Sequence, residues 1–332
     1  MASPRHFNIV ALETFFCPLP PLTVPSPHTF TLTEYTRTAA HETAERIRDA
    51  DIIITTTLRL DASVLSSTTC PNLKFIAVMA SGTDSIDLDA CKERGIRVVN
   101  SPECNVTAVA EHALGLYFAA RRSIVPSMRH LGAGQWPQRG TLMTTTYAAG
   151  KPPRGCGSET AVIYGHGAVG RAVQALFEAL GMTVLIAARK GTPPTDGRVA
   201  FEESLKVATV MVVCCPRTPE TLNLLSGPEL ALVRDDAVLV NVARGGIVDE
   251  SALLKALQEN QLAGAAVDVF ATEPASPETS PLLGPEAAHV NLVTTPHTAW
   301  IGMDTATNYR RVLQENIDGF IMDRLEKNRV KA

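Results

Sequence analysis

A glycine-rich turn between a short apolar run and an amphipathic stretch constrains the fold of this chain more than any other feature. The run Ala161–Tyr164 has the length and composition of a buried strand, and Gly165, Gly167 and Gly170 follow it in the pattern G-x-G-x-x-G. Apolar side chains then recur at helical spacing over residues 173–180. A strand, a glycine turn and a helix in this order are the context that the dinucleotide-binding fingerprint requires.

Each glycine has its own task in such a fingerprint. The first permits a tight turn, the second lets the backbone approach a pyrophosphate, and the third lets the helix pack closely on the strand. The first turn of the helix adds amide donors and the positive end of its dipole. We therefore predict a Rossmann domain that binds a dinucleotide, and the alternative is a glycine-rich turn that binds no ligand. The predicted contacts are Gly165, His166, Gly167, Ala168, Val169 and Gly170.

The end of the next predicted strand, Met182–Ala187, bears on the choice of dinucleotide. NAD sites carry an acidic residue about 20 residues beyond the fingerprint, where it accepts from the ribose 2′-hydroxyl. Here Ala188, Arg189 and Lys190 follow the strand, and the first carboxylate is that of Asp196. Two cations suit a 2′-phosphate, which arginine binds in bidentate geometry. We predict NADP(H) as the preferred cofactor and NAD(H) as a second one; the alternative is a pair of solvated charges.

Length, charge and cysteine pattern disfavour several classes of protein. A chain of 332 residues is long for one core, so two domains are expected. A formal net charge of −4 without a basic run argues against a nucleic-acid partner. No apolar run reaches the roughly 18 residues of a transmembrane helix, and the first residues lack a signal-peptide pattern. Seven scattered cysteines without C-x-x-C predict free thiols, a cytoplasmic location and no metal site.

Strand and helix patterns alternate along the chain, which predicts an α/β fold with two doubly wound parallel sheets. In the first part, the expected strands are Phe7–Leu12, Thr29–Thr36, Asp51–Thr57, Phe75–Met79 and Val98–Val99, and the expected helices are Ala40–Ala50, Asp61–Thr68, Asp87–Arg94 and Thr107–Arg121. Residues 123–158 show no period and are expected to form an arm over the site or against a partner subunit. Beyond the fingerprint, the expected strands are Thr209–Cys215, Ala237–Val242, Gly264–Phe270 and Asn291–Thr294, and the expected helices are Thr221–Leu225, Glu250–Glu259 and Asp304–Leu325.

A turn of small residues, Ala80-Ser81-Gly82-Thr83, is the sharpest feature of the first part of the chain. It follows a predicted strand, and ligands of open α/β sheets gather at the carboxyl ends of strands. The amides of a Ser-Gly-Thr turn form a nest suited to a carboxylate. A plain turn without a ligand has the same composition and is the alternative.

Three polar residues stand just after predicted strands of the fingerprinted part. Arg244 lies in NVARGGIVDE, Glu273 in DVFATEP and His297 in TPHTAW. An arginine binds the carboxylate of a 2-oxo acid and polarises its keto oxygen, and a histidine delivers a proton to that oxygen or removes it in the reverse direction. A neighbouring carboxylate fixes the tautomer of the histidine. Each residue alone is more often structural, but the three together predict reduction of a 2-oxo acid.

The chain resembles the D-isomer-specific 2-hydroxyacid dehydrogenase family, which includes NADPH-using glyoxylate/hydroxypyruvate reductases. The resemblance runs from about residue 75 to 316 and rests on SGTDSIDLDACKERGIRVVNSP, VAEHALGLYFAARR, GHGAVGRA, CPRTPETLNLL, NVARGGIVDESALLKAL, AAVDVFATEP and TPHTAW. It implies a flavodoxin-like substrate domain (1–104 with 302–332) and a Rossmann cofactor domain (105–301), separated by a cleft that holds the site. It also implies a homodimer formed through the cofactor domain.

The same resemblance implies roles for individual residues. Arg244 is the catalytic arginine that binds substrate, His297 is the acid/base, and Glu273 supports it. The substrate carboxylate is expected at Ala80, Ser81, Gly82 and Thr83. Asp268 is expected to contact the nicotinamide amide. Further cofactor contacts are implied for Thr107, Cys215, Pro216, Thr221, Val242, Ala243, Arg244, His297 and Ala299.

The chain departs from the family pattern at three places. His166 fills the second position of the fingerprint, where the family more often has an apolar residue, and we expect it near the pyrophosphate. Ala188 and Arg189 replace the usual acidic residue, as in the NADPH-using reductases. Trp300 is bulkier than the small residue common in glyoxylate-type members, so it either restricts the substrate site or favours a larger apolar substrate.

The resemblance implies NADPH-dependent reduction of a small 2-oxo acid to a D-2-hydroxy acid. One alternative is an NAD(H)-sensing, corepressor-like binding protein, which Arg189 and Lys190 disfavour. Another is a formate- or phosphite-type dehydrogenase. The pairing of Glu273 with His297 disfavours formate, because formate oxidation needs no proton delivered to a carbonyl.

Overall fold

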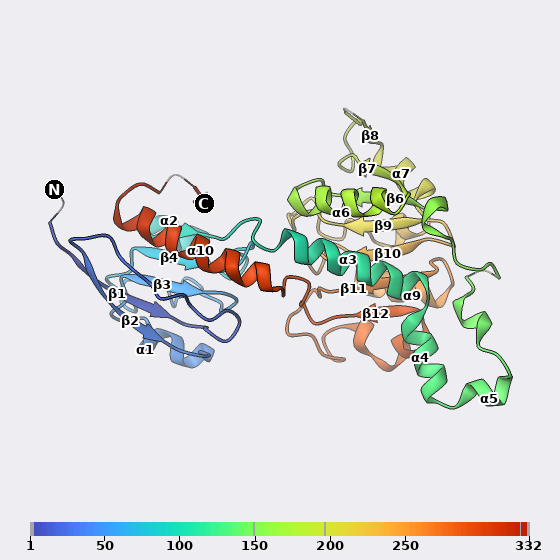
Figure 1. Ribbon diagram of the computed structural model, residues 1–332, viewed down its shortest axis with the longest axis horizontal. Helices are drawn as coiled ribbons and strands as arrows, with labels where there is room; N and C mark the ends of the chain where they lie inside the picture. The colour runs from blue at the N-terminus through green and yellow to red at the C-terminus, as the bar shows by residue number, and fades with distance from the viewer. Residues whose placement is uncertain (1–2, 149, 196, 326, 331–332) are drawn as a thin grey trace. The chain divides into compact units, whose positions relative to one another are not determined.

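The computed structural model describes residues 3–148, 150–195, 197–325 and 327–330. The chain divides into two compact units, residues 1–105 with 302–332 and residues 106–301. Each unit contains one parallel sheet with helices packed on it, which confirms the predicted fold class (Figure 1). The long helix α3 (Val106–Arg121), predicted over Thr107–Arg121, belongs to the second unit from its first residue.

The first unit has five parallel strands in the order β2-β1-β3-β4-β5, which is the flavodoxin-like order. Successive side chains of a strand point to opposite faces of the sheet. Ile76 therefore joins a core with Cys91 of α2 on one face, whereas Phe75 stacks on Phe320 of α10 with ring centroids 4.3 Å apart. The elements are β1 (His6–Ala11), β2 (Thr29–Glu34), β3 (Ile52–Thr55), β4 (Phe75–Val78), β5 (Arg97–Val99), α1 (Thr43–Arg46), α2 (Leu88–Glu93) and α10 (Met303–Ile321).

The second unit has seven parallel strands in the order β12-β11-β10-β9-β6-β7-β8, a Rossmann order extended by one strand. The strands are β6 (Thr160–Tyr164), β7 (Thr183–Ala187), β8 (Arg198–Val199), β9 (Val210–Val213), β10 (Val238–Asn241), β11 (Gly264–Val267) and β12 (Leu292–Thr294). The helices that cover the sheet are α3, α6 (Ala168–Ala179), α7 (Phe201–Val207), α8 (Gly227–Leu230) and α9 (Glu250–Gln258).

The central strands of this sheet are buried on both faces, which explains their almost continuous apolar sequence. In β6, Ile163 packs in one core with Phe177 of α6. The next residue, Tyr164, packs in the core on the other face, where its ring lies 5.8 Å from that of Phe201 in α7. Strand β8 and helix α7 were not predicted from the sequence.

The helix predicted over Asp61–Thr68 is wrong, because this stretch forms consecutive turns. Asp61 Oδ1 accepts hydrogen bonds from the backbone N–H and the hydroxyl of Ser63 and from the N–H of Val64. The Ser66 hydroxyl is within hydrogen-bond distance of those of Thr68 and Thr69. Such local side-chain bonds compete with helical ones.

The helix predicted over Thr221–Leu225 is also wrong, and a helix begins only at Gly227. The Thr221 hydroxyl donates to the carbonyl of Pro216 and accepts from the N–H of Thr218. Asn223 has a φ of +51°, which interrupts right-handed helical geometry.

The segment 123–158, whose sequence shows no period, contains two helices and two 3-10 turns among its described residues. Helix α4 (Ile124–Gly132) begins after Ser123, whose φ of +48° separates it from α3. Pro126 lies in the first turn of α4, where a helix tolerates proline. The other elements are α5 (Gln135–Arg139), η2 (Met143–Thr146) and η3 (Cys156–Ser158).

Two other predicted helices differ in their bounds from the observed ones. Only a 3-10 turn η1 (Ala40–Glu42) and the short α1 form within the helix predicted over Ala40–Ala50. The last helix ends at Ile321 rather than Leu325. No helix within the described ranges is both long and apolar enough to cross a membrane.

A buried ion pair lies in the second unit, at the amino ends of its strands. Arg121 Nε lies 2.7 Å from Glu159 Oε1, and the two side chains are 3% and 0% exposed. Arg121 also donates to the carbonyl oxygens of Asp236 and Thr209, and the Tyr117 hydroxyl donates to Glu159. Helix α3 is thereby tied to the segments that precede β6, β9 and β10.

Removal of one charge from this pair should destabilise the second unit. We expect Glu159→Gln to lower its free energy of unfolding by about 3 kcal/mol, because a buried guanidinium loses its counter-charge. Both tryptophans, Trp136 and Trp300, lie in this unit, so urea unfolding followed by tryptophan fluorescence reports on it. Glu203→Gln is the control, since its exposed pair with Lys206 should contribute less than about 1 kcal/mol. Equal effects of the two changes would contradict the prediction.

Candidate functional site

The predicted fingerprint forms the turn between β6 and α6. Gly165 has a φ of +101°, and a Cβ there would lie 2.5 Å from the backbone N and Cα of Cys215. A Cβ on Gly170 would meet the carbonyl oxygen of Gly165. At Gly167, the N-cap of α6, an added Cβ would meet nothing within 4 Å, so the helix terminus is open to an approaching phosphate. The turn therefore fits a dinucleotide pyrophosphate.

Two further predicted contacts lie in or beside this turn. His166 Nε2 is 2.6 Å from Gln174 Oε1, so the imidazole is held along α6. Cys215 follows β9, and burial raises the pKa of its thiol to about 11. A neutral thiol beside the predicted pyrophosphate site adds no negative charge that would repel phosphates.

The cations predicted at the adenosine end follow β7, and the structure distinguishes between them. Arg189 and Lys190 are both exposed, whereas Ala188 is buried. Lys190 Nζ lies 2.8 Å from Glu229 Oε1. Burial alone would raise the pKa of the Glu229 carboxyl, but its hydrogen bonds with Lys190 and Ser226 outweigh burial and the pKa is lowered. A hydrogen bond from Thr218 lowers the pKa of Glu220, and the charge of Arg189 contributes to the same shift.

Arg244 lies in a turn that the buried side chain of Asn241 organises. Asn241 is 2% exposed; its Oδ1 accepts from the N–H of Ala243 at 3.1 Å, and its Nδ2 donates to the carbonyl of Arg244 at 3.2 Å. Arg244 Nη1 donates to the carbonyl of Ala243 at 2.8 Å. Val242 and Ala243 are buried, so the chain emerges from the sheet at Arg244.

His297 and Glu273 form a direct pair, as predicted. His297 Nδ1 lies 2.6 Å from Glu273 Oε2, and the side chains are 40% and 33% exposed. The N–H of Phe270 donates to Glu273 Oε1 at 2.9 Å. Burial would raise the pKa of Glu273, but the hydrogen bonds from His297 and Phe270 and the charge of Arg244 lower it below its ordinary value. The carboxylate is thus the acceptor, and Nδ1 carries the proton of this bond.

Asp268 organises the turn that carries His297. His297 has a φ of +52°, and its N–H donates to the Asp268 carbonyl at 2.7 Å. The Asp268 carboxylate, 1% exposed, accepts from the N–H groups of Thr298 and Ala299 at 2.9 and 3.0 Å. Its predicted contact with the nicotinamide amide stays a prediction.

Trp300 supports the same turn from its other end. Its indole N–H donates to the His297 carbonyl at 3.0 Å, and its ring packs against the core beneath α3. This contact between Trp300 and the backbone of His297 was not predicted from the sequence. Four further residues of these turns and their supports were not predicted from the sequence: Asn241, Thr295, His112 and Glu250. The Glu250 carboxylate accepts from the N–H of Ala271 and the hydroxyl of Ser280.

The small-residue turn Ala80–Thr83 lies in the first unit, directly after β4. Asn100 Nδ2 donates to the Ser81 carbonyl at 2.7 Å, and the Ser81 hydroxyl donates to Asn105 Oδ1 at 2.9 Å. The turn is therefore braced by residues that follow β5. Its role in binding a carboxylate stays a prediction, as does the cofactor contact of Thr107, which is exposed in the first turn of α3.

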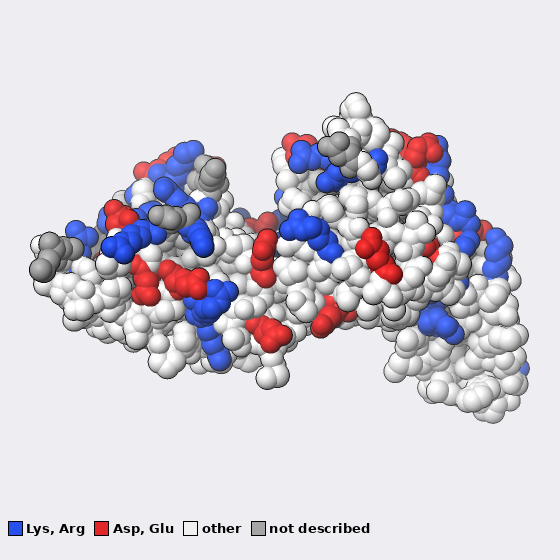
Figure 2. Space-filling model, turned by 45° about the horizontal axis from the view of Figure 1, so that its top comes forward, with Lys and Arg blue, Asp and Glu red and all other residues white. Residues whose placement is uncertain are grey.

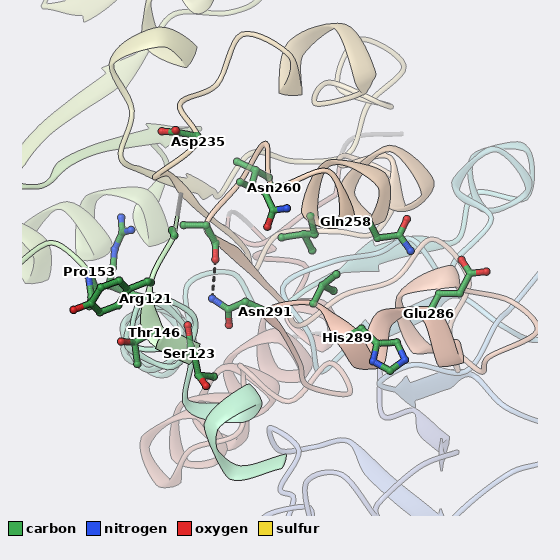
Figure 3. Close-up of a pocket in the computed structure, with 17 residues that line it drawn as sticks. Arg121, Ser123, Thr146, Pro153, Asp235, Gln258, Asn260, Glu286, His289 and Asn291 are labelled. Atoms are coloured by element: carbon green, nitrogen blue, oxygen red, sulfur yellow. Dashed lines mark hydrogen bonds between the residues drawn. The ribbon is translucent and has the colours of Figure 1, made fainter. Parts of the chain in front are cut away.

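A cavity of about 460 Å³ lies at the amino ends of strands of the second sheet, whereas the fingerprint follows the carboxyl end of β6. Figure 3 shows its lining, with Asn291 donating to the Ala263 carbonyl at 2.8 Å. Its walls come from residues that precede β10, β11 and β12 and from segment 145–148. Because Arg244, Glu273 and His297 follow these strands, the cavity is separate from the candidate site.

Comparison with known proteins identifies the family of this chain. Residues 114–299 match the model of the NAD-binding domain of D-isomer specific 2-hydroxyacid dehydrogenases. The chain is 36% identical to a glycerate dehydrogenase of Methylorubrum extorquens, over 89% of this chain and 90% of that protein. It is 32% identical to a glyoxylate reductase of Aeropyrum pernix, over 86% and 84%. A crystal structure of a Thermus thermophilus protein is 29% identical, with a TM-score of 0.77 and coverage of 98% and 100%.

The fold and the family match define an oxidoreductase with a Rossmann NAD(P)-binding domain. The chain belongs to the D-isomer specific 2-hydroxyacid dehydrogenase family. The resemblance found in the sequence is thereby confirmed.

The fingerprint glycines should respond differently to an added methyl group. We expect Gly165→Ala to lower the stability of the second unit by roughly 1–3 kcal/mol, since alanine is strained at this φ and meets Cys215. Gly167→Ala should leave the unfolding midpoint unchanged, because its methyl group points into open space. It should weaken dinucleotide binding at least about tenfold, because we expect the pyrophosphate to occupy that space. Thermal unfolding and titration calorimetry with NADPH and NADH measure both effects. Wild-type affinity in a folded Gly167→Ala protein would argue against the pyrophosphate site.

Proposed function

We propose that this protein reduces a small 2-oxo acid to the D-2-hydroxy acid, reversibly, with NADPH as the preferred cofactor. The observation that carries the proposal is the His297–Glu273 pair, 2.6 Å apart, with Arg244 close enough to lower the pKa of Glu273. A bound nicotinamide dinucleotide supplies the hydride for the keto carbon. The residues of the chain bind the acid and transfer the proton.

The proposed proton donor is His297. Because Nδ1 is bonded to Glu273, Nε2 is the nitrogen that gives a proton to the keto oxygen during reduction and takes it back in the reverse direction. The lowered pKa of Glu273 keeps its carboxylate ionised beside the ring. Arg244 is proposed to bind the substrate carboxylate and to stabilise the charge that develops on the keto oxygen. The amides of the Ala80–Thr83 turn are proposed as a second carboxylate contact.

Initial rates of NADPH and NADH oxidation with glyoxylate, hydroxypyruvate, pyruvate, 2-oxoisocaproate and phenylpyruvate test this proposal. We expect turnover of at least one of these acids and a loss of at least about 100-fold in kcat for His297→Asn. Dinucleotide affinity should change little in this variant. Absence of turnover with every acid, or retained turnover in His297→Asn, would remove the proposed reaction or the acid/base role.

The proposed preference for NADPH rests on the end of β7. The buried Ala188 stands where an acidic residue would accept from a ribose 2′-hydroxyl, and the exposed Arg189 follows it. Lys190 is already paired with Glu229, so Arg189 is the cation that we assign to the 2′-phosphate.

Arg189→Ala should raise KM for NADPH at least about tenfold and change KM for NADH by less than about threefold. Lys190→Ala is the matched control, and we expect the smaller effect on NADPH from this variant. Steady-state kinetics with a fixed 2-oxo acid measure all four values. A similar rise in KM for both cofactors in Arg189→Ala would contradict the 2′-phosphate assignment.

We also propose a homodimer formed through the cofactor unit. Ile124, Met128 and Leu131 recur on one side of α4 and are 43%, 66% and 54% exposed, and Trp136 and Met143 are 55% and 58% exposed. Arg129 and Arg139 are the charged residues of segment 124–148, and Figure 2 shows few charged side chains over it. Such apolar exposure is typical of an interaction surface.

A further inference from the structure

We propose that His112 and Thr295 are positioning residues for His297. The inference rests on the proposed function for its kinetic consequence, because it concerns the residue assigned as acid/base. Both residues act through Asp268, whose buried carboxylate binds the turn that carries His297. Neither residue is among the site residues predicted from the sequence.

A continuous chain of polar contacts runs from α3 to the His297 turn. His112 Nε2 lies 3.0 Å from Thr295 Oγ1, and the Thr295 hydroxyl donates to Asp268 Oδ1 at 2.6 Å. The same Asp268 oxygen accepts the N–H of Thr298 at 2.9 Å. Helix α3 packs in one core with β10, β11 and β12, so the backbone that carries His112 is held rigidly.

The direction of these bonds can be assigned. A hydroxyl has one proton to donate, and that of Thr295 goes to the carboxylate of Asp268. The contact with His112 therefore requires the proton on His112 Nε2. His112 Nε2 also lies 3.6 Å from Asp268 Oδ1, so the ring orients the hydroxyl and the carboxylate together.

The His297 turn needs such support because its backbone is constrained. A φ of +52° is uncommon for a residue with a side chain, and such conformations persist where surrounding contacts enforce them. Asp268 provides three of these contacts, through its carbonyl to the His297 N–H and through its carboxylate to the N–H groups of Thr298 and Ala299. If the carboxylate rotates, both carboxylate contacts are lost and the imidazole moves relative to its partner Glu273.

Two pairs of variants test the proposal, each with a matched control. Thr295→Val removes the hydroxyl at nearly constant size, and Thr295→Ser keeps it. His112→Leu removes the donor, and His112→Gln places an amide N–H at about the reach of Nε2. We expect Thr295→Val to lower kcat per dinucleotide-binding site by roughly 10- to 100-fold, because small displacements of a catalytic group carry costs of this size. Thr295→Ser should retain most of the activity.

The expected kinetic pattern separates positioning from a loss of folded protein. The stoichiometry of dinucleotide binding counts folded sites, so kcat per site is free of any unfolded fraction. The KM for the 2-oxo acid and the dissociation constant of NADPH should change by less than about threefold in Thr295→Val. His112→Leu should show a smaller decrease in kcat of the same kind, and His112→Gln should restore part of it.

Amide hydrogen exchange gives a second readout that does not depend on turnover. The amides of Thr298 and Ala299 should exchange faster in Thr295→Val than in Thr295→Ser. If the wild-type protein turns over none of the acids, the proposed function fails, and faster exchange still supports the bracing role of Thr295. Equal exchange in the two variants would overturn the inference. Equal kcat per site in an active enzyme would overturn it as well.

Discussion

The parallel pairing of β10, β11 and β12 is the constraint on which the candidate site depends. Asn241 pairs with Val267, and Val267 with Thr294, so these three strand ends lie side by side. Arg244, Glu273 and His297 follow these ends within a few residues. The register is fixed because each strand is buried on both faces, and a slip of one residue would exchange every core side chain between the faces. Residues distant in sequence therefore meet at one edge without any long loop.

The polar side chains at this edge are of two kinds. Arg244, Glu273 and His297, the residues that we propose act in the reaction, have partly exposed side chains. Asn241 and Asp268 are almost completely buried, and each is bonded to the backbone of the turn that follows its strand. A buried amide or carboxylate is costly unless its hydrogen bonds are made, so these turns have few alternative conformations. The precision of the site thus comes from residues that do not face the solvent.

The sequence was sufficient for the parts of the structure that follow from local pattern. All strands but β8, the fingerprint turn and the positions of Glu273 and His297 were predicted, because short apolar runs and glycine spacing are local signals. The helices predicted over 61–68 and 221–225 were wrong because hydrogen bonds accepted by Asp61 and donated by Thr221 replaced helical ones. His112 and Thr295 were missed for another reason. They are 183 residues apart, and no periodicity connects them; only the packing of α3 on the sheet brings them together.

The two cations after β7 form one local motif, but a contact with a residue distant in sequence distinguishes Lys190 from Arg189. The Lys190–Glu229 pair is partly exposed, and such pairs contribute about 0–1 kcal/mol, so a phosphate could compete for the ammonium group. Glu229 would keep its hydrogen bonds from the N–H and hydroxyl of Ser226, at 3.0 and 2.7 Å, but would lose its counter-charge in a nearly buried position. That loss offsets what Lys190 would gain from the phosphate. Arg189 is exposed and has the fork geometry that matches a phosphate. Its binding to a phosphate would not remove the counter-charge of Glu229, which is Lys190. The proposed preference for NADPH therefore rests on Arg189 more than on the total charge of the motif.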